Sequence, residues 1–183
     1  MPICSVFIAT SLDGFIARPD GSLDWLDDAN TTVPAGTELG YEPFMRTIDV
    51  LVIGRNTYDK VLTFGAWPYG SKRVVVLTRR PITIDPALAD RVSASAEDPA
   101  ALWARLGAEG AQRVYVDGGV TIQRFLAAGL IDNLTITVIP VVLGAGIPLF
   151  GPTGRDVALT LFDVTHYPFG FVQLRYRVTR PDR

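Results

Sequence analysis

The fold is decided by the stretch Val114-Tyr115-Val116-Asp117-Gly118-Gly119-Val120-Thr121. Its apolar start favours a buried strand, the glycine pair ends that strand, and a helix is expected to follow as far as Ala128, before Gly129. Helix N-termini carry unpaired amide groups and a partial positive charge, and glycine lets a ligand approach the backbone, so the turn favours a phosphate. The alternative is a tight strand-to-helix turn with Asp117 as its cap, and the motif alone leaves the two readings even.

A second turn of the same kind lies in Val52-Ile53-Gly54-Arg55-Asn56-Thr57-Tyr58. Here Arg55 and the hydroxyl of Thr57 follow the glycine, and arginine forms charge-assisted hydrogen bonds to phosphate. A cation at a helix start opposes the helix dipole, so a bound anion explains Arg55 better than a solvent-exposed side chain does.

A third strand ends in Val76-Leu77-Thr78-Arg79-Arg80. Taken alone, this stretch is a basic surface turn before Pro81. In open α/β sheets, however, ligands bind in the crevice at the carboxyl ends of the strands. Three such ends in a row therefore indicate several anion sites and hence a dinucleotide, although the G-x-G-x-x-G fingerprint is absent from the sequence.

The rest of the chain predicts one α/β domain over residues 1–183, with a mainly parallel central sheet flanked by helices and a C-terminal antiparallel hairpin. Asp98 and Pro99 have the pattern of a helix start. Strands are expected over 3–9, 50–53, 73–77, 91–95, 113–116, 132–142, 157–166 and 171–179. Helices are expected over 42–47, 56–61, 98–106 and 119–128, and a long loop over 11–25.

Composition excludes several classes of protein. Hydrophobic residues make up 48% of the 183 residues, enough for a core, and the net charge of -2 comes with no basic stripe, so we expect no nucleic-acid partner. A single cysteine, Cys4, is expected to be buried, and there is no thiol cluster for a metal. No apolar run is long enough to cross a bilayer and no signal peptide is visible, which predicts a cytoplasmic protein without membrane contacts.

Taken together, these pieces resemble the dihydrofolate reductase superfamily, and within it the reductase domain of the bacterial riboflavin-pathway deaminase-reductase. The resemblance extends over nearly the whole chain and also includes two further segments. These are Ala9-Thr10-Ser11-Leu12-Asp13-Gly14-Phe15-Ile16-Ala17 and Ile139-Pro140-Val141-Val142-Leu143-Gly144-Ala145-Gly146-Ile147-Pro148-Leu149-Phe150.

The resemblance implies an NADPH-dependent oxidoreductase and a place for each part of the cofactor. The residues that would hold the phosphates are Gly54, Arg55 and Thr57. Those that would hold the adenosine end and the 2′-phosphate are Leu77, Thr78 and Arg79. The pyrophosphate would lie on Gly118, Gly119, Val120 and Thr121. Backbone groups of Ala9 and Ile16 would bracket the nicotinamide, under a loop of residues 11–25. A cis bond between Gly118 and Gly119 is also implied.

The substrate half matches the family less closely, because the riboflavin-pathway enzymes carry a different segment after the second strand. Asp13 is the candidate proton donor, with a pKa raised by burial, although Asp-Gly is also a common turn pair. Trp25 is a packing residue or a platform for a flat ring. His166, the only histidine, is expected to be solvated or packed rather than catalytic.

Three functions remain open. The first is reduction of a small pteridine-like or aminopyrimidine substrate. The second is reduction of 5-amino-6-(5-phosphoribosylamino)uracil in riboflavin biosynthesis, for which Arg18 and Arg46 are the available phosphate ligands. The third is an NADP(H)-binding sensor or scaffold without turnover. A homodimer is expected, because residues 144–150 and the neighbouring strands carry much apolar surface.

Overall fold

The computed structural model of the chain describes residues 1–179. The strands are β1 (Ile3–Ser11), β2 (Phe15–Ala17), β3 (Val50–Gly54), β4 (Arg73–Leu77), β5 (Val92–Ser95), β6 (Arg113–Asp117), β7 (Ile131–Ile139), β8 (Ile147–Pro148), β9 (Leu159–His166) and β10 (Val172–Val178). The α-helices are α1 (Asp24–Asn30), α2 (Tyr41–Arg46), α3 (Arg55–Val61), α4 (Pro99–Ala108) and α5 (Gly119–Ala127). Short 3-10 helices cover Leu62–Phe64 and Pro86–Leu88.

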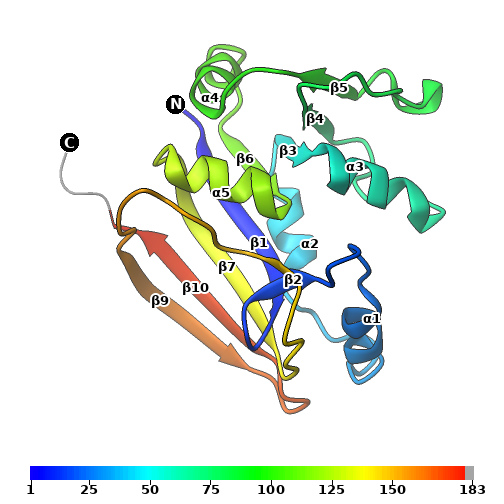
Figure 1. Cartoon of the computed structure of the whole chain (residues 1–183), viewed down its shortest axis with the longest axis vertical. Helices are drawn as coiled ribbons and strands as arrows, with labels where there is room; N and C mark the ends of the chain where they lie inside the picture. The colour runs from blue at the N-terminus through cyan, green and yellow to red at the C-terminus, as the bar shows by residue number, and fades with distance from the viewer. Residues whose placement is uncertain (180–183) are drawn as a thin grey trace.

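The central sheet has the strand order β5-β4-β3-β6-β1-β7-β10-β9 (Figure 1). The six strands from β5 to β7 are parallel, β10 is antiparallel to β7, and β9 is antiparallel to β10. This confirms the predicted mainly parallel sheet with a C-terminal antiparallel hairpin. Within the hairpin, β10 joins the sheet and β9 becomes its edge, with His166 exposed at the end of that strand.

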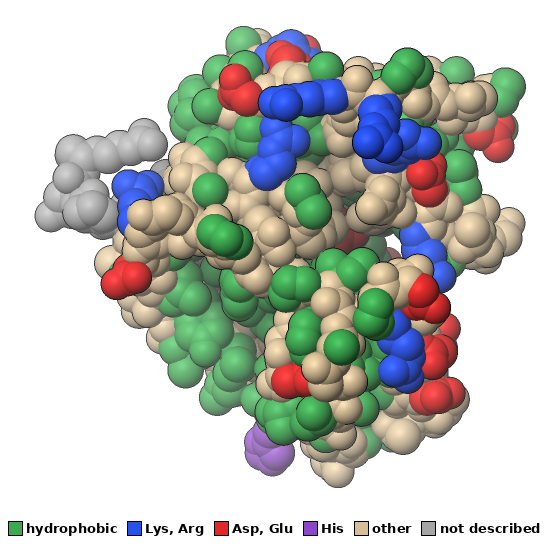
Figure 2. All heavy atoms as spheres, in the orientation of Figure 1, with side chains coloured by type: hydrophobic (Ala, Val, Ile, Leu, Met, Phe, Trp, Pro, Cys, Tyr) green, Lys and Arg blue, Asp and Glu red, His purple; other side chains and the backbone are tan. Residues whose placement is uncertain are grey.

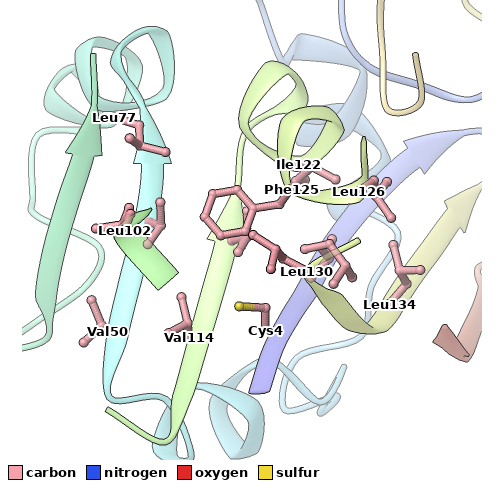
Figure 3. Packing of buried hydrophobic residues seen from close by; sticks show 14 of the residues in the cluster. Cys4, Val50, Leu77, Leu102, Val114, Ile122, Phe125, Leu126, Leu130 and Leu134 are labelled. Carbon is pink, nitrogen blue, oxygen red and sulfur yellow. The ribbon is translucent and has the colours of Figure 1, made fainter. Parts of the chain in front are cut away.

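The parallel strands are apolar on both sides because helices cover both faces of the sheet. Along β3, Val50 and Val52 face one cluster of buried side chains, and Leu51 and Ile53 face another. The first cluster includes α4 and α5 and contains Cys4, as predicted (Figure 3). The second cluster receives side chains from α2 and α3.

The expected helix starting at Asp98 is confirmed by its cap. The Asp98 carboxylate accepts a hydrogen bond of 2.9 Å from the amide of Ala101, and Pro99 occupies the first turn. None of the helices in residues 1–179 is long and apolar enough to span a membrane.

The predicted long loop over 11–25 is the main error in secondary structure. It contains β2, which pairs with β8, and its end forms the start of α1. Three- and two-residue strands are too short to show an alternating pattern in the sequence. Because β2 is fixed to β8, this segment has a defined position at the end of β1 (Figure 1).

Candidate functional site

The two predicted glycine turns meet at the carboxyl ends of β3 and β6. A Cβ atom on Gly54 would lie 2.8 Å from the Thr121 hydroxyl, and a Cβ atom on Gly118 would overlap the Thr57 hydroxyl. Each threonine therefore fills the space that the glycine of the other turn leaves. Thr57 and Thr121 thus pack the start of α3 against the start of α5. The backbone amides at the start of α5 have no side-chain cap.

A pocket of about 640 Å³ opens beside these turns. It brings together four residues predicted from the sequence, namely Arg55, Leu77, Thr78 and Arg79. Asn56 and Arg80, which belong to the two predicted anion-binding stretches, also line it. The prediction missed Asp59 and Arg124. Arg124 lies in the last turn of α5, so a helical projection from Gly119 is the signal that could have found it.

The positive charge of this pocket is only weakly compensated. Arg55 makes a long ion pair with Asp59, at 3.4 Å, and residues 1–179 contain no ion pair to Arg79, Arg80 or Arg124. The Thr78 hydroxyl shapes the basic turn, because it accepts the Arg80 amide at 3.1 Å and donates to the Arg80 carbonyl at 2.9 Å. A pocket with this charge suits an anion with several phosphates.

β1 and β6 are paired only near their amino-terminal ends. These strands pair only through Ile3–Ser5, whereas β1 stays paired with β7 as far as Ser11. Ala9 therefore lies in the part of β1 that has left β6. Ile16 on β2 closes the other side, since its Cδ1 atom would lie 3.1 Å from a Cβ atom on Gly119. Ile16 thus borders the start of α5, whereas Ala9 packs against the cluster of Trp25, Ile139 and Phe171.

The cis bond predicted for the Gly118–Gly119 turn is wrong. Residues 1–179 contain no cis peptide bond, and the sharp turn is made instead by Gly118, with φ 91° and ψ 134°. A side chain on Gly119 would meet Ile16 and the Pro148 carbonyl oxygen, at 3.1 and 3.3 Å. The amide of Gly118 also donates to the Asp117 carboxylate at 2.8 Å, which leaves the amides from Gly119 onward for an anion.

The expected raised pKa of Asp13 is wrong as well. Asp13 is exposed, and its carboxylate accepts hydrogen bonds from the Ser11 hydroxyl (2.7 Å) and from the amides of Leu143 and Gly144 (3.1 and 2.7 Å). The bond from Ser11 is the main cause of a lowered pKa. The observed geometry is that of an anchor between the β1–β2 turn and the segment after β7, while a catalytic role stays a prediction.

Sequence reasoning missed a second carboxyl group, Asp117, at the carboxyl end of β6. Desolvation raises its pKa to about 6, and the hydrogen bond from the Gly118 amide and the nearby hydroxyls of Tyr69 and Tyr115 oppose that shift. The Tyr115 hydroxyl donates its proton to the Phe7 carbonyl oxygen at 2.8 Å.

The phenol of Tyr41 lies near Asp117. Desolvation is the main cause that raises the pKa of Tyr41 to about 12, and the charge of Asp117 adds to the rise. The Asp117 carboxylate accepts the amide of the next residue, Gly118, which precedes the first turn of α5. Asp117 therefore does not cap α5, and the predicted cap is wrong.

Trp25 has the packing role proposed for it. It is 4% exposed in the first turn of α1 and packs with Ile139 and Phe171. Its indole nitrogen is buried and has no hydrogen-bond partner in residues 1–179. Stacking of a flat ring on Trp25 would require this cluster to open.

The chain is similar to proteins of a known family. The family model described as the RibD C-terminal domain matches residues 2–172. The chain is 38% identical to the uncharacterized protein YwjB of Bacillus subtilis (strain 168), over 93% of this chain and 95% of YwjB.

Solved structures show the same fold. A Shewanella sp. PV-4 protein provisionally assigned to riboflavin biosynthesis superposes with a TM-score of 0.91 at 38% identity, covering 97% of this chain and 99% of that protein. The diaminohydroxyphosphoribosylaminopyrimidine deaminase/5-amino-6-(5-phosphoribosylamino)uracil reductase of Thermotoga maritima superposes with a TM-score of 0.70 at 14% identity. That match covers 97% of this chain and 57% of the Thermotoga protein.

Proposed function

Since this chain belongs to the RibD C-terminal domain family, of the dihydrofolate reductase superfamily, we propose that it is an NADPH-dependent reductase of a pteridine-like or aminopyrimidine substrate. The observation that carries the proposal is the arginine-lined pocket beside two interlocked strand-glycine-helix turns. Related proteins act in riboflavin biosynthesis as pyrimidine reductases, which supports this class of substrate.

The residues present fit a phosphorylated dinucleotide. Arg79 and Arg80 would hold the 2′-phosphate at the end of β4, with Arg55 and Arg124 on the facing walls of the pocket. The uncapped amides that begin α5 would bind the pyrophosphate. Ala9 and Ile16 would border the nicotinamide beyond the paired part of β1 and β6.

The chemistry requires one hydride and one proton. When bound, the reduced nicotinamide supplies the hydride to a ring carbon, while the adjacent ring atom takes a proton, so NADPH is oxidised and the substrate gains two hydrogens. We assign the proton to Asp117, because a carboxyl group with a pKa of about 6 is partly protonated near neutral pH. Tyr69, beside it, would hold the orientation of its carboxyl group.

The proposal is tested by incubating the purified protein with NADPH and a panel of heterocycles while the absorbance of the reduced nicotinamide is followed. Oxidation that depends on a pterin or aminopyrimidine is the expected result. Tight NADPH binding with no oxidation by any compound would instead support a sensor or scaffold. Absence of NADPH binding would contradict both functions.

Replacing Arg79 with alanine should weaken NADPH binding and leave NADH binding nearly unchanged. A charge-assisted hydrogen bond contributes about 1.5–3 kcal/mol, which corresponds to a loss of roughly 10- to 100-fold in affinity. Titration of each cofactor against both proteins measures the effect. Arg91→Ala is the matched control, because Arg91 is paired with Asp90 before β5, outside the pocket. An equal loss for NADH and NADPH would refute the assignment of the 2′-phosphate to Arg79.

We also propose that the protein is a homodimer. The edge strand β9 exposes Leu159, Leu161 and Val164 by 38, 49 and 55%, and Phe150 is 47% exposed. Unpaired apolar edge strands are suited to association. Light scattering should give about twice the chain mass of 19.9 kDa. Leu161→Asp should yield monomers, whereas Leu62→Asp, on an exposed leucine next to α3, should not. A monomeric wild-type protein at micromolar concentration would refute the proposal.

A further inference from the structure

The charges around the crevice are divided between its two ends. Basic side chains gather over α3 and α5 in the upper half of Figure 2, and several acidic ones gather over α1 in the lower half. The basic end is the arginine-lined pocket, which the proposed function assigns to NADPH. The end near α1 and β2 is therefore left for the substrate, and its charge bears on what the substrate can be.

Several other cations lie away from the substrate end. Arg46, which the sequence offered as a phosphate ligand, ends α2 just before the start of β3, at the opposite edge of the sheet. Arg73 and Arg113 begin β4 and β6 at that same edge, and Lys72 donates to the Ile48 carbonyl there.

Arg175 and Arg18 are two further cations, and both are already paired. Arg175, within β10, makes an ion pair with Asp163 at 3.3 Å and donates to the Gln173 side chain at 3.0 Å. Arg18 follows directly after β2, and its Nε atom lies 2.7 Å from the Asp24 carboxylate. Neither guanidinium is free to neutralise a phosphate without losing its partner.

The surroundings of Arg18 are acidic. Asp24 is the main cause of its raised pKa, and Asp20 and Asp28 add to the rise through their charges. One positive charge thus stands against three negative charges at the point where the chain leaves Ile16 and enters α1. A dianionic phosphate that entered here would be repelled, with an interaction that salt screens because these side chains are exposed.

The inner part of the crevice offers hydrogen bonds instead of cations. Asp117 is surrounded there by the phenols of Tyr41, Tyr69 and Tyr115. Hydroxyl and carboxyl groups present donors and acceptors that suit the polar edge of a neutral nitrogen heterocycle.

We propose that the substrate is an uncharged, unphosphorylated nitrogen heterocycle, and that Asp20, Asp24 and Asp28 select against phosphoribosyl compounds. The inference rests on the proposed function and narrows its substrate class. It distinguishes this chain from a reductase of 5-amino-6-(5-phosphoribosylamino)uracil, whose substrate carries a phosphate that these residues disfavour.

The test is a binding measurement that needs no turnover. The protein saturated with NADP⁺ is titrated with 5-amino-6-(5-phosphoribosylamino)uracil and with the same compound lacking its phosphate. At low salt we expect the phosphorylated compound to bind about tenfold more weakly, equivalent to about 1.4 kcal/mol. Raising the ionic strength from about 0.01 M to about 1 M shortens the Debye length from about 30 Å to about 3 Å and should remove most of that difference.

The variant Asp24→Asn sharpens the test, because it removes one negative charge and releases Arg18. It should improve binding of the phosphorylated compound selectively. Asp156→Asn is the matched control, since Asp156 lies beside the end of α5, at the opposite edge of the sheet.

Equal or tighter binding of the phosphorylated compound by the wild-type protein would overturn the inference, as would an unchanged ratio in Asp24→Asn. A protein that binds NADP⁺ but neither compound would overturn it too, while leaving the cofactor assignment intact. Failure to bind NADP⁺ is the separate result that would refute the proposed function.

Discussion

Asp117→Asn should lower kcat by about 10²- to 10⁴-fold, the usual contribution of a positioned general acid. Asparagine keeps the size of the side chain and can still accept the Gly118 amide, so the turn into α5 should persist. NADPH affinity should not fall, because Asp117 does not line the arginine pocket and its replacement removes a negative charge near the bound phosphates. Single-turnover measurement of nicotinamide oxidation separates the loss of the chemical step from any loss of binding.

The pH dependence of the wild-type enzyme should reveal the same group. A proton donor with a pKa of about 6 is in its active, protonated form at low pH, so kcat should fall as the pH rises through about 6. The phosphates of a cofactor bound nearby would raise this midpoint, because negative charge disfavours ionisation. Asp117→Asn should abolish the inflection.

Asp13→Asn provides the contrast. Asp13 has a lowered pKa and anchors the segment at Leu143 and Gly144, so its loss should disturb the β1–β2 turn without moving the inflection near pH 6. If Asp13→Asn removed the inflection and Asp117→Asn kept it, the roles assigned to the two carboxyl groups would be reversed.

The stability of the folded protein should also depend on the protonation of Asp117. Asp117 has a raised pKa in the folded state, so the folded protein holds this proton more tightly than the unfolded chain does. Its contribution to stability is therefore present below the ordinary carboxyl pKa and is lost as the pH rises through about 6. Denaturant unfolding at several pH values should show this decline in the wild type and a weaker one in Asp117→Asn.

The sequence was sufficient for those parts of the site that repeat a local pattern. Gly54 and Gly118 each follow a buried strand and precede a helix, and both turns were predicted from that order. Leu77, Thr78 and Arg79 were placed in the pocket because they end a neighbouring parallel strand. Parallel strands bring such ends to one edge of the sheet, so local patterns sufficed.

The remaining parts depend on contacts between distant segments. The carboxylate of Asp13 is fixed by amides about 130 residues further along the chain, and no local pattern announces that pairing. The raised pKa of Asp117 arises because the fold desolvates it beside Tyr69, which lies on a segment before β4. The sequence does not distinguish an aspartate that anchors a turn, such as Asp13, from one proposed to donate a proton, such as Asp117. Their pKa values differ because their tertiary surroundings differ.

Gly118→Ala should be the most damaging single-methyl change in the site. Gly118 has φ 91° and ψ 134°, a conformation that residues with a side chain rarely adopt and that costs of order 1–3 kcal/mol. The new Cβ atom would also overlap the Thr57 hydroxyl, so α3 and α5 would have to separate. Both turns of the proposed cofactor site would then shift, and we expect lower stability together with a loss of NADPH affinity of at least tenfold.

Two variants resolve the causes of that damage. Gly36→Ala imposes a positive φ of 79° on alanine at a site with no atom within 4 Å of the Cβ position, so it reports backbone strain alone and should leave NADPH affinity unchanged. The second variant combines Gly118→Ala with Thr57→Ala. Alanine at position 57 removes the overlapping hydroxyl, which serine would keep. Thr57→Ala in the Gly118→Ala background should therefore restore part of the stability measured by denaturant unfolding. If Gly118→Ala matched Gly36→Ala in stability and kept full NADPH affinity, the two turns would not be interlocked as the structure shows, because the overlap with Thr57 would then have no cost.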